Sequence, residues 1–245
     1  MTMINEKERH SSKNKDRLRP RIESELLVQE KDATDAWRIL KIMSEFVEGF
    51  EVLRKYKRAV TFFGTARCSL DDESYKQANE LASRLSKSDF TIITGGASGI
   101  MEAANKGAFE AGGESVGLNI KLPREQGPNP FTTDSASFSH FFSRKVMLSF
   151  ASEVYVYFPG GFGTLDEFFE LVTLVQTKKI RSIPIILIGR EYWEPLLAWI
   201  DSSLYRKYHT IGKEDMQIYH LIDSVDEAYD LIIELVEKYC KVYDC

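Results

Sequence analysis

Cysteine and recognisable metal-binding motifs are scarce in this chain. Its 245 residues include three cysteines, widely scattered at Cys68, Cys240 and Cys245. An odd, scattered set does not make a disulfide framework, and the lack of C-x-x-C and H-E-x-x-H patterns argues against a zinc site. We therefore expect no bound metal, and we interpret Cys68 as a free thiol.

Long apolar runs and an excess of positive charge are lacking too. The longest strongly apolar runs, such as IPIILI at 183–188, are far too short to span a bilayer, and the N-terminus has no apolar signal core. The formal net charge is −5, which gives no reason to expect a nucleic-acid-binding protein. These observations predict a cytoplasmic protein that contacts neither membrane nor nucleic acid.

Two common nucleotide-binding motifs are absent. No G-x-x-x-x-G-K-[ST] loop occurs, which argues against a P-loop nucleotidase. In the G-x-G-x-x-G pattern, Gly161 and Gly163 fit the first two positions, but Asp166 occupies the third. An NAD enzyme is therefore only a weak alternative.

The N-terminal part of the chain differs in character from the rest. Residues 1–20 are polar and charged with almost no large apolar side chains, so we expect a disordered tail. Residues 32–56 then place apolar side chains at three- and four-residue steps, which predicts one long amphipathic helix, or two joined near Gly49. We interpret this helix as an N-terminal extension of a single domain over residues 21–245.

Short apolar runs alternate with helical patterns from residue 59 onward. Because continuous apolar strands are typical of a parallel sheet covered on both faces, we predict an α/β fold with a Rossmann-like, doubly wound sheet and a ligand crevice at its carboxyl edge. The predicted strands cover 59–64, 90–96, 115–120, 153–161 and 183–189, with a short extended segment at 131–133. The predicted helices cover 74–88, 99–113, 137–152, 164–179, 191–205 and 224–240.

Glycine turns follow three of these strands, in FFGTAR, ITGGASG and PGGFGT. Glycine lets backbone N–H groups approach a ligand closely, and the start of the next helix favours an anion, most simply a phosphate. A single glycine turn would indicate only a tight connection, but three glycines in four residues favour a phosphate site. The candidate phosphate and substrate contacts are Gly64, Thr65, Gly95, Gly96, Gly160, Gly161, Gly163 and Thr164.

Glu167 follows the last of these turns and has two interpretations. Thr164 and Glu167 have the spacing of a capping box, in which the glutamate bonds back to the start of its own helix. Alternatively, Glu167 faces the crevice one helical turn beyond the phosphate site, where its carboxylate can act on a bound sugar phosphate. The spacing alone leaves both open.

Charged side chains interrupt the otherwise apolar helix predicted at 137–152. Arg144 and Lys145 either reach solvent or point into the crevice toward phosphate and carboxylate, where the planar guanidinium suits an oxyanion. We interpret His140, one turn earlier, as structural. Glu125 lies in the proline-rich loop 122–130 and is either solvated or close to the ligand.

The stretch PGGFGTLDE resembles the P-G-G-x-G-T-x-x-E signature of the LOG ("Lonely guy") family, and SRKVM resembles that family's second motif. The similarity extends over roughly residues 58–205 and includes TGGASGIMEAANKGAFEAGG and FFGTAR. LOG proteins are phosphoribohydrolases that activate cytokinins and are often mislabelled lysine decarboxylases. The resemblance implies hydrolysis of AMP or an N6-modified AMP to free base and ribose 5-phosphate, without a cofactor, by a homodimer or higher homo-oligomer.

The resemblance also implies roles for individual residues. Arg144 and Glu167 would be catalytic, the glycine turn with Thr164 would hold the phosphate, Lys145 would assist, and Glu125 would lie near the nucleotide. Glu102 and the loop 122–130 depart from compact family members and resemble a longer bacterial branch. Two other functions stay open: a nucleotide-binding module without turnover, and a lysine decarboxylase, which would need pyridoxal phosphate on a lysine that no pattern marks.

Overall fold

The computed structural model describes residues 35–121 and 128–243. The chain divides into two units, Met1–Lys41 and Ile42–Cys245. Of the first unit, the described residues 35–41 are the opening turns of helix α2 (Asp35–Leu53), a single helix within the predicted range 32–56. Residues 32–34 of that prediction lie outside the described residues. The predicted tail at 1–20 lies outside the described residues. The second unit contains the sheet and every feature discussed below.

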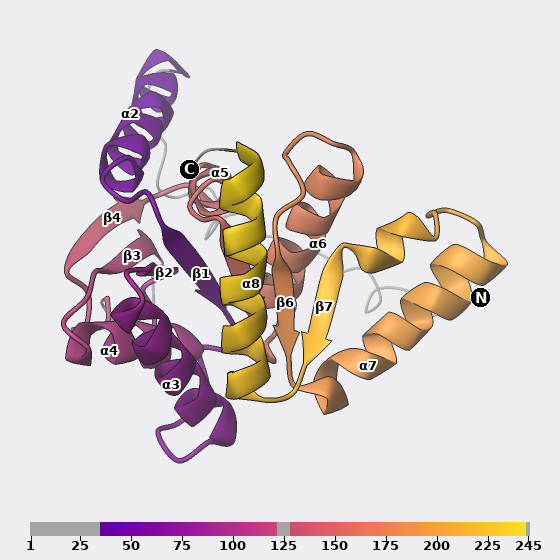
Figure 1. Ribbon diagram of the computed structural model, residues 1–245. Coiled ribbons are helices and arrows are strands. Elements are labelled where there is room, and N and C mark those ends of the chain that lie inside the picture. Colours follow the sequence, from indigo (N-terminus) through magenta and orange to yellow (C-terminus); the bar gives the residue numbers. More distant parts are fainter. Residues whose placement is uncertain (1–34, 122–127, 244–245) are drawn as a thin grey trace, which may run out of the picture. The chain divides into compact units, whose positions relative to one another are not determined.

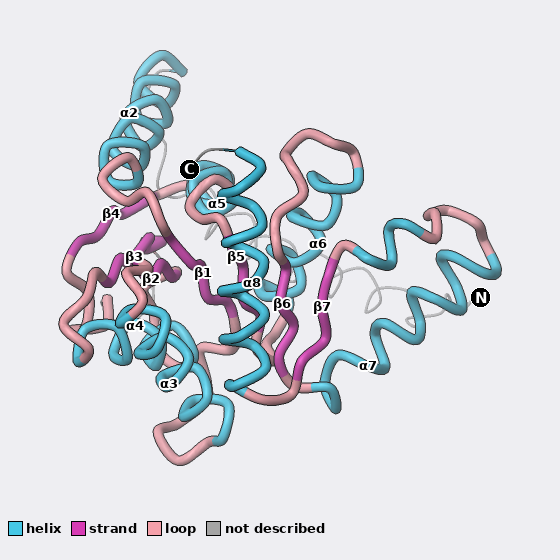
Figure 2. The backbone as a smooth tube through the Cα atoms, in the orientation of Figure 1, coloured by secondary structure: helices cyan, strands magenta, loops and turns pink. Residues whose placement is uncertain are grey.

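The second unit is built on a parallel seven-stranded sheet in the order β4-β3-β2-β1-β5-β6-β7. Strands and helices alternate along most of the chain, as Figures 1 and 2 show, with β4 following β3 directly in the element order. The predicted α/β, doubly wound architecture is therefore confirmed. The strands are β1 (Ala59–Phe63), β2 (Thr91–Thr94), β3 (Ser115–Ile120), β4 (Asp134–Phe138), β5 (Val154–Tyr157), β6 (Ile185–Ile188) and β7 (Tyr219–Ile222).

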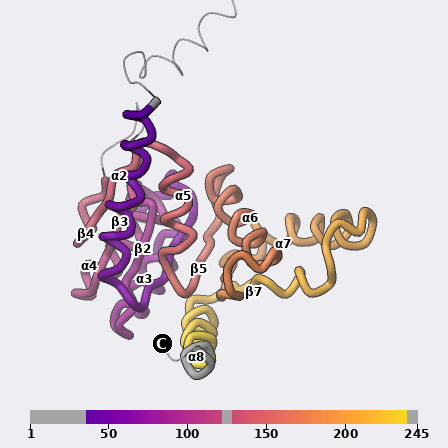
Figure 3. Tube along the Cα trace, turned by 90° about the horizontal axis from the view of Figure 1, so that it is seen from above, coloured from indigo at the N-terminus to yellow at the C-terminus, as the bar shows by residue number. Residues whose placement is uncertain are grey.

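Helices cover both faces of the sheet because its central strands are apolar on both sides. On β5, Val154 and Val156 pack into one core cluster while Tyr155 and Tyr157 pack into the other. The first cluster includes side chains of α3 (Glu73–Lys87), α4 (Ile100–Glu110) and α8 (Val225–Tyr243). The second includes side chains of α5 (Phe141–Ser149), α6 (Phe162–Gln176) and α7 (Arg190–Trp199). Figure 3 shows α8 on the side of the sheet opposite α5 and α6.

The direction of winding reverses between β1 and β5. The chain runs outward from β1 to β4, then returns to β5 beside β1 and runs outward again to β7. Connections that leave neighbouring strands toward opposite faces open a crevice at the carboxyl edge of the sheet. The glycine turns after β1 and β5 flank this crevice, and Thr65 N–H donates a 3.0 Å hydrogen bond to the Pro159 carbonyl across it.

Most predicted bounds differ from the structure by a few residues, and one helix start was assigned to the wrong kind of element. Residues 137–138 belong to β4 and not to a helix at 137–152, because Asp134–Phe138 pair in register with β3 and α5 begins only at Phe141. The extended segment predicted at 131–133 lies just before this strand. The sequence interpretation also missed β7, a half-buried edge strand paired with β6. Beyond α7 the chain continues as a π-helical segment, Ile200–Lys207, and a short 3-10 helix, Glu214–Gln217.

Within the described residues, no helix is both long enough and apolar enough to cross a membrane.

Candidate active site

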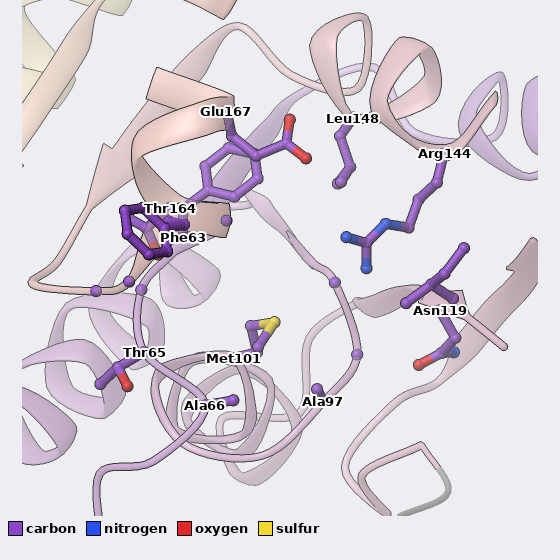
Figure 4. A pocket seen from close by; sticks show the side chains of 18 of the residues that line it. Phe63, Thr65, Ala66, Ala97, Met101, Asn119, Arg144, Leu148, Thr164 and Glu167 are labelled. Atoms are coloured by element: carbon purple, nitrogen blue, oxygen red, sulfur yellow. The ribbon is translucent and has the colours of Figure 1, made fainter. Parts of the chain in front are cut away.

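A cavity of about 1130 Å³ lies at the carboxyl edge of the sheet. The turns after β1, β2 and β5 line it, together with the first turns of α5 and α6 (Figure 4). Sequence positions more than 100 residues apart therefore meet in one space. Most of the predicted site residues line it: Gly64, Thr65, Gly95, Gly96, Arg144, Gly160, Gly161, Gly163, Thr164 and Glu167.

The glycines of this cavity serve two different purposes. Gly96 has φ +71, and a Cβ there would lie 2.0 Å from Asn119 Oδ1, so the turn after β2 requires glycine for close packing. A Cβ at Gly161 or Gly163 would instead meet nothing within 4 Å. The backbone around these two residues faces open space in the cavity, which a ligand can occupy.

Helix α6 begins earlier than the capping box requires. The helix starts at Phe162 with Gly161 as its N-cap, so Thr164 is the third helical residue and Glu167 the sixth. No side chain caps this end. The capping interpretation of Glu167 is therefore wrong. The residues of the first turn line the cavity, and their backbone N–H groups, which lack intrahelical acceptors, can donate hydrogen bonds to an anion there.

Glu167 and Arg144 extend from different helices into the same space (Figure 4). Glu167 is only 6% exposed. The Arg144 guanidinium reaches over the turn after β2, since a Cβ on Gly95 would lie 3.5 Å from its Nη1, and its Cζ lies 5.6 Å from the centre of the Phe141 ring. A carboxylate and a guanidinium thus share one cavity with the open glycine turn.

Burial raises the pKa of Glu167 to about 7, and this effect outweighs the nearby positive charge of Arg144. The charges of Glu170 and Asp166 raise the pKa further, while that of Lys145 lowers it. With a pKa near neutrality, the carboxyl group can accept and release a proton at ordinary pH.

The raised pKa has a cost in stability. Between pH 4.5 and about 7 the folded protein holds a proton that the unfolded chain has released, so this group makes the free energy of unfolding fall as pH rises through that window. Glutamine cannot ionise, so we expect Glu167→Gln to be more stable than the wild type by roughly 3 kcal/mol at pH 8 and by much less at pH 5. Urea unfolding of both proteins at the two pH values measures this difference, and an equal difference at both would contradict it.

Lys145 does not line the cavity. Its Nζ lies 2.8 Å from Asp166 Oδ2 and 3.2 Å from Glu170 Oε2, and none of these three residues lines the cavity. The three charges form a cluster beside Glu167, and Lys145 compensates the two neighbouring carboxylates there. We therefore leave Lys145 out of the substrate contacts. Glu125 lies outside the described residues.

The sequence interpretation missed two polar residues that shape the cavity. Asn119 is buried and lines the cavity at the end of β3, where an asparagine inside an apolar strand was an available signal. The Tyr192 hydroxyl donates a 2.6 Å hydrogen bond to the Gly160 carbonyl and so fixes the glycine turn. Tyr192 lies in α7, 32 residues further along the chain, and no local pattern marks it.

Cys68 and His140 lie outside this set of lining residues. Burial raises the pKa of the half-buried Cys68 thiol, with a further contribution from Asp72, so a reactive thiolate is disfavoured. His140 Nδ1 lies 3.1 Å from Glu45 Oε2 at the start of α5. Both placements agree with the interpretation of Cys68 as a free thiol and of His140 as structural.

Comparison with known proteins finds both family models and individual relatives that match this chain. A family model described as "Possible lysine decarboxylase" matches residues 101–232, more than half of the chain, and one described as "DNA recombination-mediator protein A" matches residues 45–125. The cytokinin riboside 5′-monophosphate phosphoribohydrolase LOG1 of Arabidopsis thaliana is 28% identical over 192 residues, covering 76% of this chain and 85% of that protein. The phosphoribohydrolase LOG of Oryza sativa subsp. japonica is 26% identical over 197 residues, covering 78% and 76%.

Solved structures share the fold. The molybdenum cofactor carrier protein of Chlamydomonas reinhardtii superposes with a TM-score of 0.56 at 22% identity, over 74% of this chain and 99% of that one. This likeness shows the fold alone. The family model that matches more than half of the sequence, with the relatives that bear the family's name, shows that the chain belongs to the LOG family.

Proposed function

We propose that this protein hydrolyses the N-glycosidic bond of a nucleoside 5′-monophosphate, either AMP or an N6-modified AMP, to free base and ribose 5-phosphate. The observation that carries the proposal is the shared cavity: Glu167 and Arg144 face the same space as the open glycine turn at the start of α6. Membership of the LOG family and the names of LOG1 and LOG support the same activity.

The phosphate would lie against the backbone N–H groups around Gly161 and Gly163, at the N-terminus of α6. This seat is remote from the bond that breaks, so its binding energy orients the ribose and places C1′ near Glu167. Arg144 would hold phosphate or ribose oxygens with its planar guanidinium. A cavity of about 1130 Å³ has room for the base as well.

The carboxylate of Glu167 would stabilise positive charge at C1′ and position the attacking water, since glycoside hydrolysis passes through an oxocarbenium-like transition state. The water oxygen bonds to C1′, and the C1′–N bond breaks with its electron pair leaving on the base. The proton that the water gives up passes to Glu167 and then returns to the departing base. A pKa of about 7 suits this exchange near neutral pH.

Release of free base from nucleoside monophosphates, compared with the corresponding nucleosides, tests the proposal. We expect turnover of the monophosphates and very slow turnover of the nucleosides, because the latter cannot use the phosphate seat. Binding of AMP without any release of base would favour the alternative of a nucleotide-binding module.

A lysine decarboxylase does not fit these residues. Pyridoxal phosphate would need a lysine for its Schiff base. Among the described residues that line the cavity, the only lysine is the exposed Lys121 at the end of β3. Lys145 is held by Asp166 and Glu170 outside the cavity. We therefore derive no reaction through this cofactor.

Substitution of a glycine at which an added side chain would contact nothing tests the proposed phosphate site by itself. Gly161 has φ −94, which any residue adopts, and an added Cβ would meet no atom within 4 Å. We expect Gly161→Ala to change the free energy of unfolding by no more than about 0.5 kcal/mol. The methyl group would nevertheless narrow the seat, so KM for AMP and Kd for ribose 5-phosphate should rise about tenfold, a cost near 1.4 kcal/mol. Unchanged values for both ligands would place the phosphate elsewhere.

We also propose that the protein forms a homo-oligomer through α5 and α6. Large aromatic side chains stay exposed on and beside these helices, and Phe162 at the cavity is 91% exposed. Several exposed aromatic side chains on two neighbouring helices are typical of an interface. Sedimentation at micromolar concentration should show a dimer or larger species, and a monomer would contradict the proposal. The exposed residues are Phe141, Phe142, Phe150, Phe162 and Phe169.

A further inference from the structure

A buried carboxylate outside the cavity holds the connection between β4 and α5. Glu45 is 5% exposed and belongs to the part of α2 that lies within the unit Ile42–Cys245. Its Oε1 accepts a 2.8 Å hydrogen bond from the Ser139 N–H. Its Oε2 accepts one from the Ser143 hydroxyl and lies 3.1 Å from His140 Nδ1. A single side chain of α2 thus bonds to three residues around the start of α5.

Hydrogen bonds keep this carboxylate charged. Burial acts to raise the pKa of Glu45, but the hydrogen bonds from Ser143, Ser139 and His140 outweigh burial and leave the pKa below its ordinary value. A buried carboxylate with satisfied oxygens is strongly tied to its donors, since removing one partner leaves the others unpaired.

The contacts surround the first turn of α5. His140 is the N-cap of the helix, and its side chain makes no capping hydrogen bond to the helix backbone. Ser143 is the third helical residue and is fully buried. A negative charge is favourable at a helix N-terminus. Glu45 therefore supplies from another helix the stabilisation that the N-cap side chain of α5 does not.

This turn determines where Arg144 lies. Arg144 directly follows Ser143, and its N–H donates a 3.3 Å hydrogen bond to the His140 carbonyl. Phe141 and Arg144, on the same turn, both line the cavity, whereas Glu45 does not. Any loosening of residues 139–143 would move the guanidinium, while the glycine turn and Glu167 are carried by other elements.

We propose that Glu45 is a positioning residue for Arg144, through which the N-terminal helical extension helps to build the active site. The part of this inference that concerns catalysis rests on the proposed function. The part that concerns the anchoring of α5 rests on the contacts of Glu45 alone.

Three variants of the full chain test the inference. Glu45→Ala removes the anchor, and Glu45→Gln keeps the shape and one acceptor oxygen. Ile232→Ala creates a cavity under α8 on the opposite face of the sheet and serves as the control for a general loss of stability. Hydrogen exchange of the peptide 139–149, followed by mass spectrometry, reports on α5 without any substrate, and kcat/KM for AMP per folded molecule reports on the site.

We expect Glu45→Ala to speed exchange in 139–149 about tenfold or more and to lower kcat/KM by a similar factor, because it removes charge-assisted hydrogen bonds. Glu45→Gln should recover only part of both losses, because it keeps one acceptor oxygen and no charge, and Ile232→Ala should lower the melting temperature without either local effect. Unchanged exchange in Glu45→Ala, or an equal loss of kcat/KM in Ile232→Ala, would overturn the inference. If the wild type releases no base, the proposed function fails, but the exchange result still decides whether Glu45 anchors α5.

Discussion

Replacing Glu167 by glutamine is expected to abolish base release while the protein stays folded. Glutamine keeps the size of the side chain but cannot carry the negative charge or accept the proton that the reaction needs. Removing a general base of this kind commonly costs 10²–10⁴-fold in rate, so we expect kcat for AMP to fall by about 10³-fold or more. Steady-state release of adenine measures the loss.

The same variant should bind ligand well. Glu167 contributes to the transition state more than to the ground state, so Kd for ribose 5-phosphate should change little. Asp166→Asn is a matched control, because this carboxylate is the preceding residue of α6 but pairs with Lys145 outside the cavity. We expect its kcat to stay within a few-fold of the wild type. A Glu167→Gln protein with wild-type turnover would remove the carboxylate from the mechanism.

The second large effect is expected at Arg144. Arg144→Met removes a guanidinium that shares the cavity with Glu167 and that we propose holds the substrate, and each charge-assisted hydrogen bond lost costs roughly 1.5–3 kcal/mol. We therefore expect kcat/KM for AMP to fall by about 10²-fold or more. Because the charge of Arg144 lowers the pKa of Glu167, its removal should also move the acidic limb of the pH–rate profile to higher pH.

Arg144→Lys separates charge from shape. Lysine keeps the positive charge but lacks the planar fork that holds two oxygens at once. The acidic limb of the pH–rate profile should therefore stay near its wild-type position, while KM for AMP should rise. If Arg144→Met leaves both KM and the acidic limb unchanged, Arg144 neither binds the substrate nor influences Glu167.

The sequence predicted best those features that depend on local pattern. The strand predicted at 115–120 is β3 with the same bounds, because a continuous apolar run ends at a charged residue and a proline-rich loop. The glycine turns could be located from the sequence because several glycines between a strand and a helix favour a turn that a ligand approaches closely. Their meeting at one edge followed from the general rule for doubly wound sheets, so the main lining residues of the cavity could be predicted before any coordinates.

Features that depend on distant contacts were not predictable. The segment 134–138 is a strand because β3 offers it a partner, not because its own residues favour one. The capping spacing of Thr164 and Glu167 was misleading, since the chain enters α6 two residues before Thr164. Lys145 faces away from the cavity because Asp166 and Glu170 on α6 attract it.

The contacts of Glu45 could not be predicted from the sequence either, because they join residues far apart in the chain. Nothing in the amphipathic pattern of 32–56 distinguishes this glutamate from the solvated acids around it. Its role becomes visible only when α2 is seen to meet the start of α5, where Ser139, His140 and Ser143 converge on one carboxylate.

The products formed from AMP by the wild-type protein test the central claim most directly. Chromatography of the base together with phosphorus NMR of the sugar distinguishes cleavage at C1′ from cleavage at the phosphate. We expect adenine and ribose 5-phosphate in equal amounts, with no free phosphate. Adenosine and inorganic phosphate as the products would show that the protein hydrolyses the phosphate ester bond instead. That result would contradict the placement of C1′ beside Glu167.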